Sequence, residues 1–191
     1  MVRYTSPMRL RFNEAKVAQA AAVLLALRGG KMSYMKLVKL LYLADRESLL
    51  RWGRPLSTDV HVSMDHGPVL SQTLDLIYED PSNVQGQVWS KYISAPANYE
   101  VQLVSTEFPT DELSKAEKKL IASVFERFGK LSRWQIRDYV HELPEWVDPN
   151  GSAIPISYAS ILRAGGKTDE QIDSILEELR NLQQFQACLS A

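Results

Sequence analysis

The sequence contains a single cysteine, Cys188, among its 191 residues. One cysteine cannot form a disulfide within the chain, so the fold does not depend on an oxidising compartment and we expect a cytoplasmic protein. The longest apolar run, residues 18–27, is interrupted by Gln19 and is shorter than the roughly 20 residues that cross a bilayer. The first twelve residues contain no apolar stretch of signal-peptide length. We therefore expect neither membrane insertion nor secretion.

The sequence also lacks the common catalytic motifs. It has no G-x-G-x-x-G or P-loop glycine pattern, no G-x-S-x-G elbow and no paired-cysteine zinc signature. Metal-ligand residue types gather at one place, which holds Asp59, His61, Asp65 and His66, but their spacing matches no zinc or facial-triad pattern. We expect no metal, no cofactor and no catalytic residue. A metal-dependent hydrolase or nuclease that uses Asp59, His61 and His66 remains the alternative.

The balance of charge differs between the two ends of the chain. Residues 1–44 carry eight basic side chains and one acidic side chain, whereas residues 45–191 carry 14 basic and 22 acidic ones. A basic segment can attract nucleic acid, so a nucleic-acid-binding regulator is a second alternative. We do not expect DNA binding, on two grounds. The helix expected after Ser33 is too apolar for a recognition helix, and the basic segment lacks interleaved aromatic residues.

Apolar periodicity predicts a buried central helix. Leu37, Leu40, Leu41 and Ala44 follow the i, i+3, i+4, i+7 spacing of one helical face, and a second apolar stripe runs beside it. A helix that is apolar on two faces needs neighbours on both, so we expect it at the centre of its domain. The expected start is near Ser33, and the expected end is before residues 53–55.

Other local signals predict the remaining elements, and together they indicate a mainly α fold: a compact helical domain of about six or seven helices with one small β-hairpin. The alternation at 59–64 suits a short strand or an extended loop, and that at 87–105 a hairpin. Further helices are expected over 14–28, from Pro68 to a point before Pro81, after Ser114, after Ser132, over 156–163 and after Thr168.

Four motifs resemble one family. They are Leu37-Val38-Lys39-Leu40-Leu41-Tyr42-Leu43-Ala44, Trp52-Gly53-Arg54-Pro55-Leu56, His66-Gly67-Pro68-Val69 and Val140-His141-Glu142-Leu143-Pro144-Glu145-Trp146. In this order they resemble the Panacea (SocA-like) antitoxin domain of bacterial and phage toxin–antitoxin systems. The resemblance spans most of residues 14–165. We therefore divide the chain into an N-terminal extension (1–12), an antitoxin-like domain (13–166) and a C-terminal helix packed on the same domain (167–191).

The resemblance implies an antitoxin that is not an enzyme and that binds a cognate protein toxin encoded nearby; homo-oligomerisation is possible. We expect the shared motif residues to maintain the fold: Leu37, Leu40, Leu41, Tyr42, Gly67, Pro68, His141 and Glu142. Adjacent helical residues point about 100° apart, so His141 and Glu142 do not converge on one atom. We expect His141 to bond a loop carbonyl instead.

Two segments are candidates for toxin binding. The last helix carries a surplus of acidic residues that could face a basic toxin cleft, among them Asp169, Asp173, Glu177 and Glu178. The rival is the loop from Trp52 to Pro68, where we expect Arg54 and the turn before Pro68 to be exposed. Its candidate contact residues are Trp52 and Arg54. We favour the acidic helix because shared motifs more often maintain a shared fold.

Overall fold

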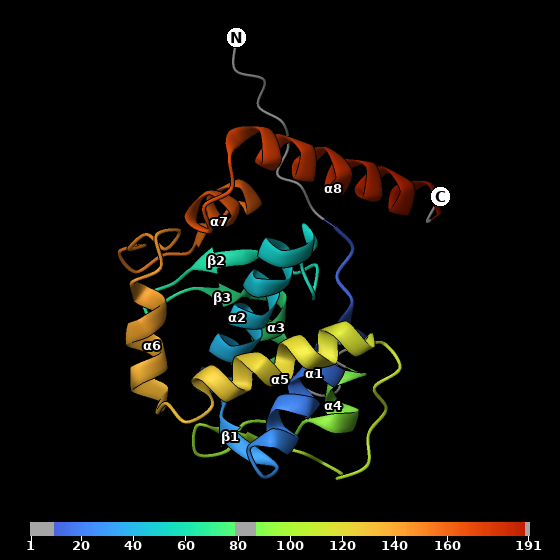
Figure 1. The fold of residues 1–191 in the computed structure, drawn as a ribbon. Helices are drawn as coiled ribbons and strands as arrows, with labels where there is room; N and C mark the ends of the chain where they lie inside the picture. The colour runs from blue at the N-terminus through green and yellow to red at the C-terminus, as the bar shows by residue number, and fades with distance from the viewer. Residues whose placement is uncertain (1–9, 79–86, 190–191) are drawn as a thin grey trace.

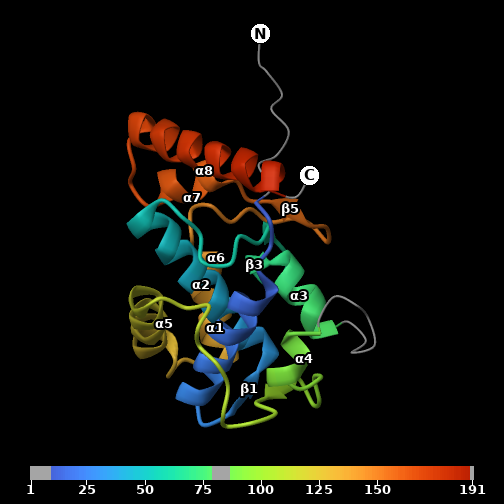
Figure 2. The same ribbon diagram turned by 90° about the vertical axis from the view of Figure 1, so that its right-hand side faces the viewer.

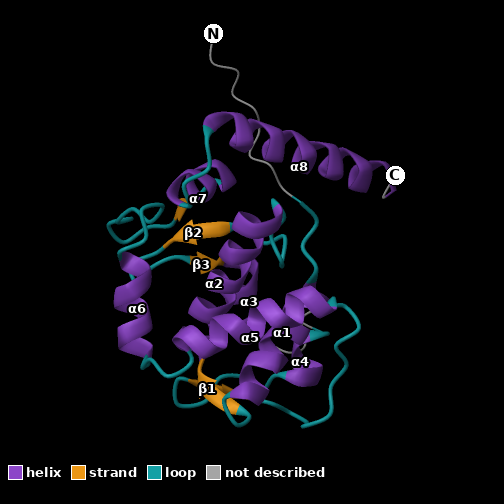
Figure 3. Cartoon of the chain, viewed as in Figure 1, coloured by secondary structure: helices purple, strands orange, loops and turns teal. Residues whose placement is uncertain are grey.

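The computed structural model describes residues 10–78 and 87–189, which form eight helices and five short strands (Figures 1 and 3). The helices are α1 (Glu14–Leu27), α2 (Tyr34–Trp52), α3 (Ser71–Tyr78), α4 (Trp89–Tyr92), α5 (Lys115–Phe128), α6 (Arg133–His141), α7 (Tyr158–Ala164) and α8 (Asp169–Leu189). The strands are β1 (Lys31–Ser33), β2 (His61–Ser63), β3 (Val69–Leu70), β4 (Glu100–Gln102) and β5 (Ile154–Pro155). The predicted mainly α fold is confirmed.

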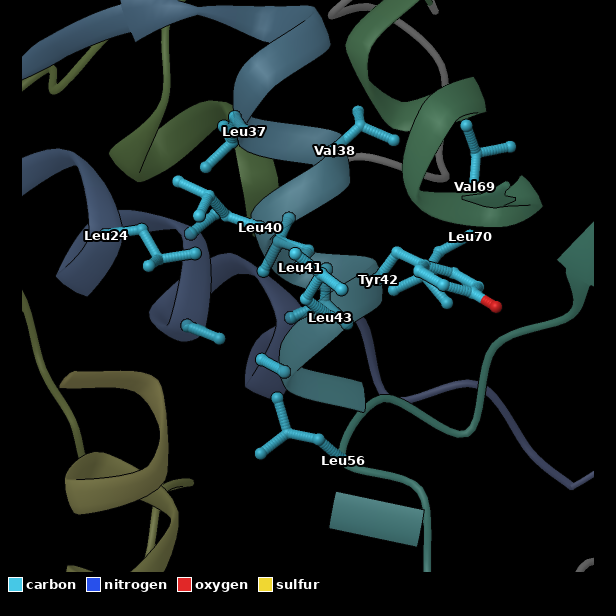
Figure 4. Packing of buried hydrophobic residues seen from close by; sticks show 14 of the residues in the cluster. Leu24, Leu37, Val38, Leu40, Leu41, Tyr42, Leu43, Leu56, Val69 and Leu70 are labelled. Carbon is cyan, nitrogen blue, oxygen red and sulfur yellow. The ribbon is translucent and has the colours of Figure 1, made fainter. Parts of the chain in front are cut away.

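Helix α2 lies at the centre, as the two apolar stripes predict. It packs against α1, α5, α6, α7 and β3, so different neighbours cover its different faces. Figure 4 shows Leu40 on the side of Leu24 from α1, whereas Tyr42 points toward Leu70 from β3. Leu40 and Tyr42 are completely buried. Burying each of these large side chains contributes roughly 1.5 to 3 kcal/mol, which makes α2 the main core element.

The helix boundaries follow from local capping. The Asn13 side chain accepts the backbone N–H of Lys16 at the start of α1. Ser114 forms the predicted capping box with Glu117, and Ser132, expected only as a cap, forms another with Gln135. Helix α2 ends at Gly53, whose φ of 67° is left-handed and therefore suits glycine.

The strands form two small antiparallel sheets. One sheet has the order β3-β2-β5, and the other joins β1 to β4. Strand β2 confirms the short strand expected within residues 59–64. The predicted hairpin over 87–105 is present in reduced form, because bridges join Ile93 to Leu103 and Ala97 to Glu100. Its first part is the helical turn α4. The sequence does not predict this helix, which raises the number of helices to eight.

The helix predicted to begin at Pro68 starts at Ser71 instead. Val69 and Leu70 form β3 and pair with β2. The Asp59 carboxylate accepts the backbone N–H groups of Gln72 and Thr73 at 2.9 and 2.8 Å, which caps α3 from another element. The predicted end before Pro81 lies outside the described residues.

Helices α7 and α8 form one end of the molecule, with β1 at the opposite end (Figures 1 and 2). The apolar side of α8 packs on α7 and buries Ile172 and Leu179. Its other side is exposed. The exposed side of α8 and the surface around β1 therefore lie at opposite ends of the molecule.

Candidate functional site

The motifs that are far apart in the sequence meet in one buried polar network. The Tyr42 hydroxyl donates to Glu145 Oε1 at 3.0 Å, and Arg46 Nη2 donates to Glu145 Oε2 at 3.3 Å. Arg46 Nε also donates to Glu145 Oε1. The Glu145 side chain is fully buried, so the carboxylate depends on these two partners for its hydrogen bonds. The network therefore fastens the segment after α6 to the central helix.

Burial and charge act together on this network. Burial raises the pKa of the Tyr42 hydroxyl well above its usual range, and the neighbouring Glu145 carboxylate raises it further. Burial alone would lower the pKa of Arg46, but its hydrogen bond and charge attraction to Glu145 outweigh burial, so the net shift is upward. Tyr42 is thus a neutral donor and Arg46 a permanent cation. Neither group is prepared to exchange protons near neutral pH.

A second pair lies beside the first. His61 Nε2 and Asp45 Oδ2 are 2.7 Å apart in the core, although their relative orientation is not that of a hydrogen bond. Asp45 Oδ1 accepts the backbone N–H of Ser57. The His61 ring packs edge-on against Tyr42 and Tyr158, with ring centroids 5.7 and 5.5 Å away. The Asp45–His61 pair is therefore enclosed by aromatic rings rather than open to a ligand.

The four residues considered as metal ligands have separate positions and partners. Asp59 caps α3, His61 pairs with Asp45, and Asp65 Oδ1 accepts the backbone N–H of Gly151. His66 is exposed. Within residues 10–78 and 87–189, no group of three or more His, Cys, Asp or Glu side chains is placed to hold a metal ion.

His141 and Trp146 hold the loop before Gly67. His141 Nε2 donates to the Asp65 carbonyl at 3.2 Å, which confirms the expected bond to a loop carbonyl. Trp146 Nε1 donates to the Met64 carbonyl at the same distance, and its ring lies 4.4 Å from that of His141. Glu142, the other half of the motif pair, is exposed.

Lys39, on α2, binds the same loop through a hydrogen bond. Its ammonium donates to the Pro68 carbonyl at 2.8 Å, and the side chain is almost completely buried. Burial lowers the pKa of Lys39 from 10.5 to about 7. Gly67 passes so close that an added Cβ would lie 2.9 Å from Val140 Cγ2 and 3.3 Å from Lys39 Nζ. Its φ of +89° also favours glycine.

The network holds segments together and presents no catalytic arrangement among the described residues. Its acids and bases satisfy one another instead of converging on an open position where a substrate atom could sit. Sequence reasoning did not identify Asp45, Arg46 and Glu145 as partners within it. The available signal was weak: Asp45 and Arg46 continue an apolar helical stretch in which charged residues need partners.

The two segments proposed for toxin binding lie next to each other. On α8, Asp169, Asp173, Glu177 and Glu178 are exposed. Trp52 is 43% exposed at the end of α2, and Arg54 is exposed beyond it. Gly53, between them, packs against α8, because an added Cβ would lie 3.3 Å from Ile175 Cγ1. By contrast, Gly67 and Pro68 are buried.

Among the described helices, none combines the length and apolar character that crossing a membrane requires.

Comparison with known proteins agrees with the motifs. Neither the curated proteins nor the solved structures yield a match. The sequence model of the family described as "Antitoxin SocA-like, Panacea domain" matches residues 37–147, more than half of the 191 residues. This range contains the motifs of α2, the Gly67 loop and the network residue Glu145. The chain therefore belongs to the SocA-like Panacea antitoxin domain family.

Proposed function

We propose that this protein is an antitoxin that neutralises a cognate toxin by direct protein–protein binding. Family membership carries this proposal. The candidate site supports binding over catalysis, because its ionisable groups are buried and paired with one another. On this proposal the network maintains a rigid domain, and the toxin meets an exposed surface of that domain.

The test uses the protein encoded beside this one. We expect the neighbouring gene product to arrest growth when expressed alone, and growth to resume when this chain is expressed with it. We also expect the two purified proteins to form a stable complex in size-exclusion chromatography. Rescue of growth without any complex between the purified proteins would refute direct binding, even if the antitoxin role held.

We place the toxin on the exposed side of α8, for which charge and position provide support. The acidic surface consists of Asp169, Asp173, Glu177 and Glu178, and α8 lies outside the matched range 37–147. A partner-specific element is expected to vary outside the shared domain. Many toxins act on RNA or nucleotides through a basic cleft, which an acidic helix complements. Trp52 and Arg54 extend the same end of the molecule and form the rival surface.

The docking surface is tested by reversing Asp173, Glu177 and Glu178 to lysine together. We expect about tenfold or more slower association with the toxin, because steering between opposite charges is lost. The difference should shrink with added salt, which screens exposed charges. Growth rescue should weaken in parallel.

A matched control reverses the exposed acids Glu107, Glu126 and Asp138, which changes net charge equally elsewhere on the surface. Circular dichroism should show both variants folded. If the α8 variant keeps full affinity and rescue, α8 is excluded, and Trp52→Ala with Arg54→Ala becomes the next test.

A further inference from the structure

A cavity of about 290 Å³ is lined by residues of β1 and of the connection between α5 and α6. Figure 1 shows β1 at the end of the molecule opposite α8. Four cationic side chains line the cavity: Arg28, Lys31, Lys36 and Arg133. Its lining includes one acid, Glu100. Arg28, Lys31 and Lys36 follow one another from the end of α1 to the start of α2, and the fold brings Arg133 from the start of α6 to join them.

The charges that line the cavity are only partly compensated. Glu100 pairs with Lys31 at 2.7 Å, which leaves Arg28, Lys36 and Arg133 without an acid among the described residues of the lining. Lys36 is buried, and its ammonium donates to the Gly129 carbonyl at 2.6 Å. Burial lowers the pKa of Lys36, and repulsion from Arg28 lowers it further. An anion in the cavity would relieve that repulsion.

Ser33 contributes an unused polar group to the same lining. It is the N-cap residue of α2, yet its side chain makes no capping hydrogen bond. Its Oγ is inaccessible and lacks a hydrogen-bond partner in the described part of the chain. A buried hydroxyl without a partner is unfavourable. Rotation of the Ser33 side chain toward the cavity would let the hydroxyl donate to a ligand oxygen.

Two aromatic residues contact Arg133, which lines the cavity. The Arg133 guanidinium lies 4.8 Å from the Trp134 ring centroid and 5.8 Å from that of Tyr99. Trp134 and Tyr99 are 46% and 67% exposed. These contacts hold Arg133 in place and leave ring surface exposed beside it. Such rings can stack on a nucleobase.

We propose that this cavity binds a condensed phosphate, supplied either as free pyrophosphate or as the diphosphate of a nucleotide. Three uncompensated cations exceed the charge of about −1.5 to −2 on one phosphate monoester, which favours at least two phosphoryl groups. Guanidinium groups suit phosphate because they donate parallel hydrogen bonds. This site lies at the other end of the molecule from α8 and is independent of the proposed toxin surface.

The test is isothermal titration calorimetry of the full chain with pyrophosphate, ADP and adenosine. We expect pyrophosphate and ADP to bind and adenosine not to bind at the same concentrations. Affinity should fall with added salt. ADP binding tighter than pyrophosphate assigns the nucleotide, and equal or weaker binding assigns free pyrophosphate. Failure of both phosphates to bind at about 1 mM, an affinity of about 4 kcal/mol, would overturn the proposal.

Two double variants test whether the phosphate binds in this cavity. Arg28→Glu with Arg133→Glu should weaken phosphate binding by about a hundredfold, because two phosphate donors become repulsive. Lys115→Glu with Lys119→Glu makes the same change of net charge at exposed positions of α5 and should leave affinity within about twofold. Equal losses in both would show nonspecific attraction and refute the site.

Ser33→Ala provides a milder test. The variant should fold normally because the hydroxyl makes no capping hydrogen bond. It should weaken phosphate binding by about three- to tenfold through loss of one hydrogen bond to the anion. Unchanged binding of both phosphates by the folded variant would remove Ser33 from the proposed site and contradict this part of the proposal.

Discussion

The Tyr42 hydroxyl donates a 3.0 Å hydrogen bond to Glu145 across 103 positions of the sequence. Arg46 binds the same carboxylate, so two residues one helical turn apart on α2 hold the segment after α6. Removing charges from water is costly, and a buried pair stabilises little compared with its hydrophobic replacement. Removing only one partner of a buried ion pair is strongly destabilising, because the remaining charge stays buried and unpaired.

Glu145→Gln should destabilise the protein by about 3 to 5 kcal/mol, because Arg46 loses its countercharge within the network. Chemical denaturation measures this change. The control is Glu47→Gln, which breaks the ion pairs of Glu47 with Arg51 and Arg127 on the outer side of the same helix. That change should cost about 0.5 kcal/mol or less. Similar costs for the two variants would show that Glu145 is not a structural anchor.

Leu40→Asp should prevent folding. Leu40 is completely buried on α2, and an unpaired carboxylate there costs several kcal/mol against a total stability of about 5 to 15 kcal/mol. Leu27→Asp, on α1 but 46% exposed, should remain folded. Thermal melts followed by circular dichroism distinguish them. An unchanged melting temperature for Leu40→Asp would contradict the assignment of α2 as the core helix.

Gly67→Ala should destabilise the protein by about 2 to 4 kcal/mol, through left-handed backbone strain and a clash with Val140. Gly151→Ala separates the two causes. Gly151 has a similar φ of +80°, but nothing lies within 4 Å of an added Cβ, so its change should cost about 1 kcal/mol. Urea denaturation gives both values. Equal costs would mean that the clash contributes nothing.

The sequence predicts those parts of the fold that local chemistry determines. Helices α5 and α6 begin where Ser114 and Ser132 can form capping boxes, because both partners lie within three residues of one another. The start of α3 escaped prediction, because Asp59 caps it from another element. Alternation also could not distinguish the helical turn α4 from a strand in so short a segment.

The candidate site was less predictable than the fold. The motifs identify Tyr42 and His141, but nothing in their spacing shows that Glu145 accepts a hydrogen bond from the Tyr42 hydroxyl. Pairing across such distances depends on how α6 docks on α2, which a single sequence does not encode in any local pattern. Arg46 and Glu145 therefore became visible as partners only in three dimensions.

The last prediction concerns Lys39 and the dependence of stability on pH. The folded-state pKa of Lys39 is about 7, below its ordinary value of 10.5. Between these pH values the unfolded chain keeps a proton that the folded chain has released. The unfolded state then binds more protons, so the free energy of unfolding rises with pH across this window. Below pH 7 both states are charged, and the folded state bears the full cost of burying the ammonium. A shift of this size corresponds to about 5 kcal/mol.

Lys39→Met removes this titration while keeping an apolar side chain of similar length. The variant's stability relative to the native protein should be greatest near pH 7 and should fall by several kcal/mol as the pH approaches about 10. His141 faces Lys39, and burial and the Lys39 charge lower the pKa of its imidazole, which moves its titration away from this pH window. Urea denaturation at about pH 7, 8.5 and 10 measures the difference. Lys119→Met, at an exposed position of α5, should show no such trend. A pH-independent difference for Lys39→Met would mean that Lys39 keeps an ordinary pKa and that the loop at Pro68 is held by a permanently charged ammonium.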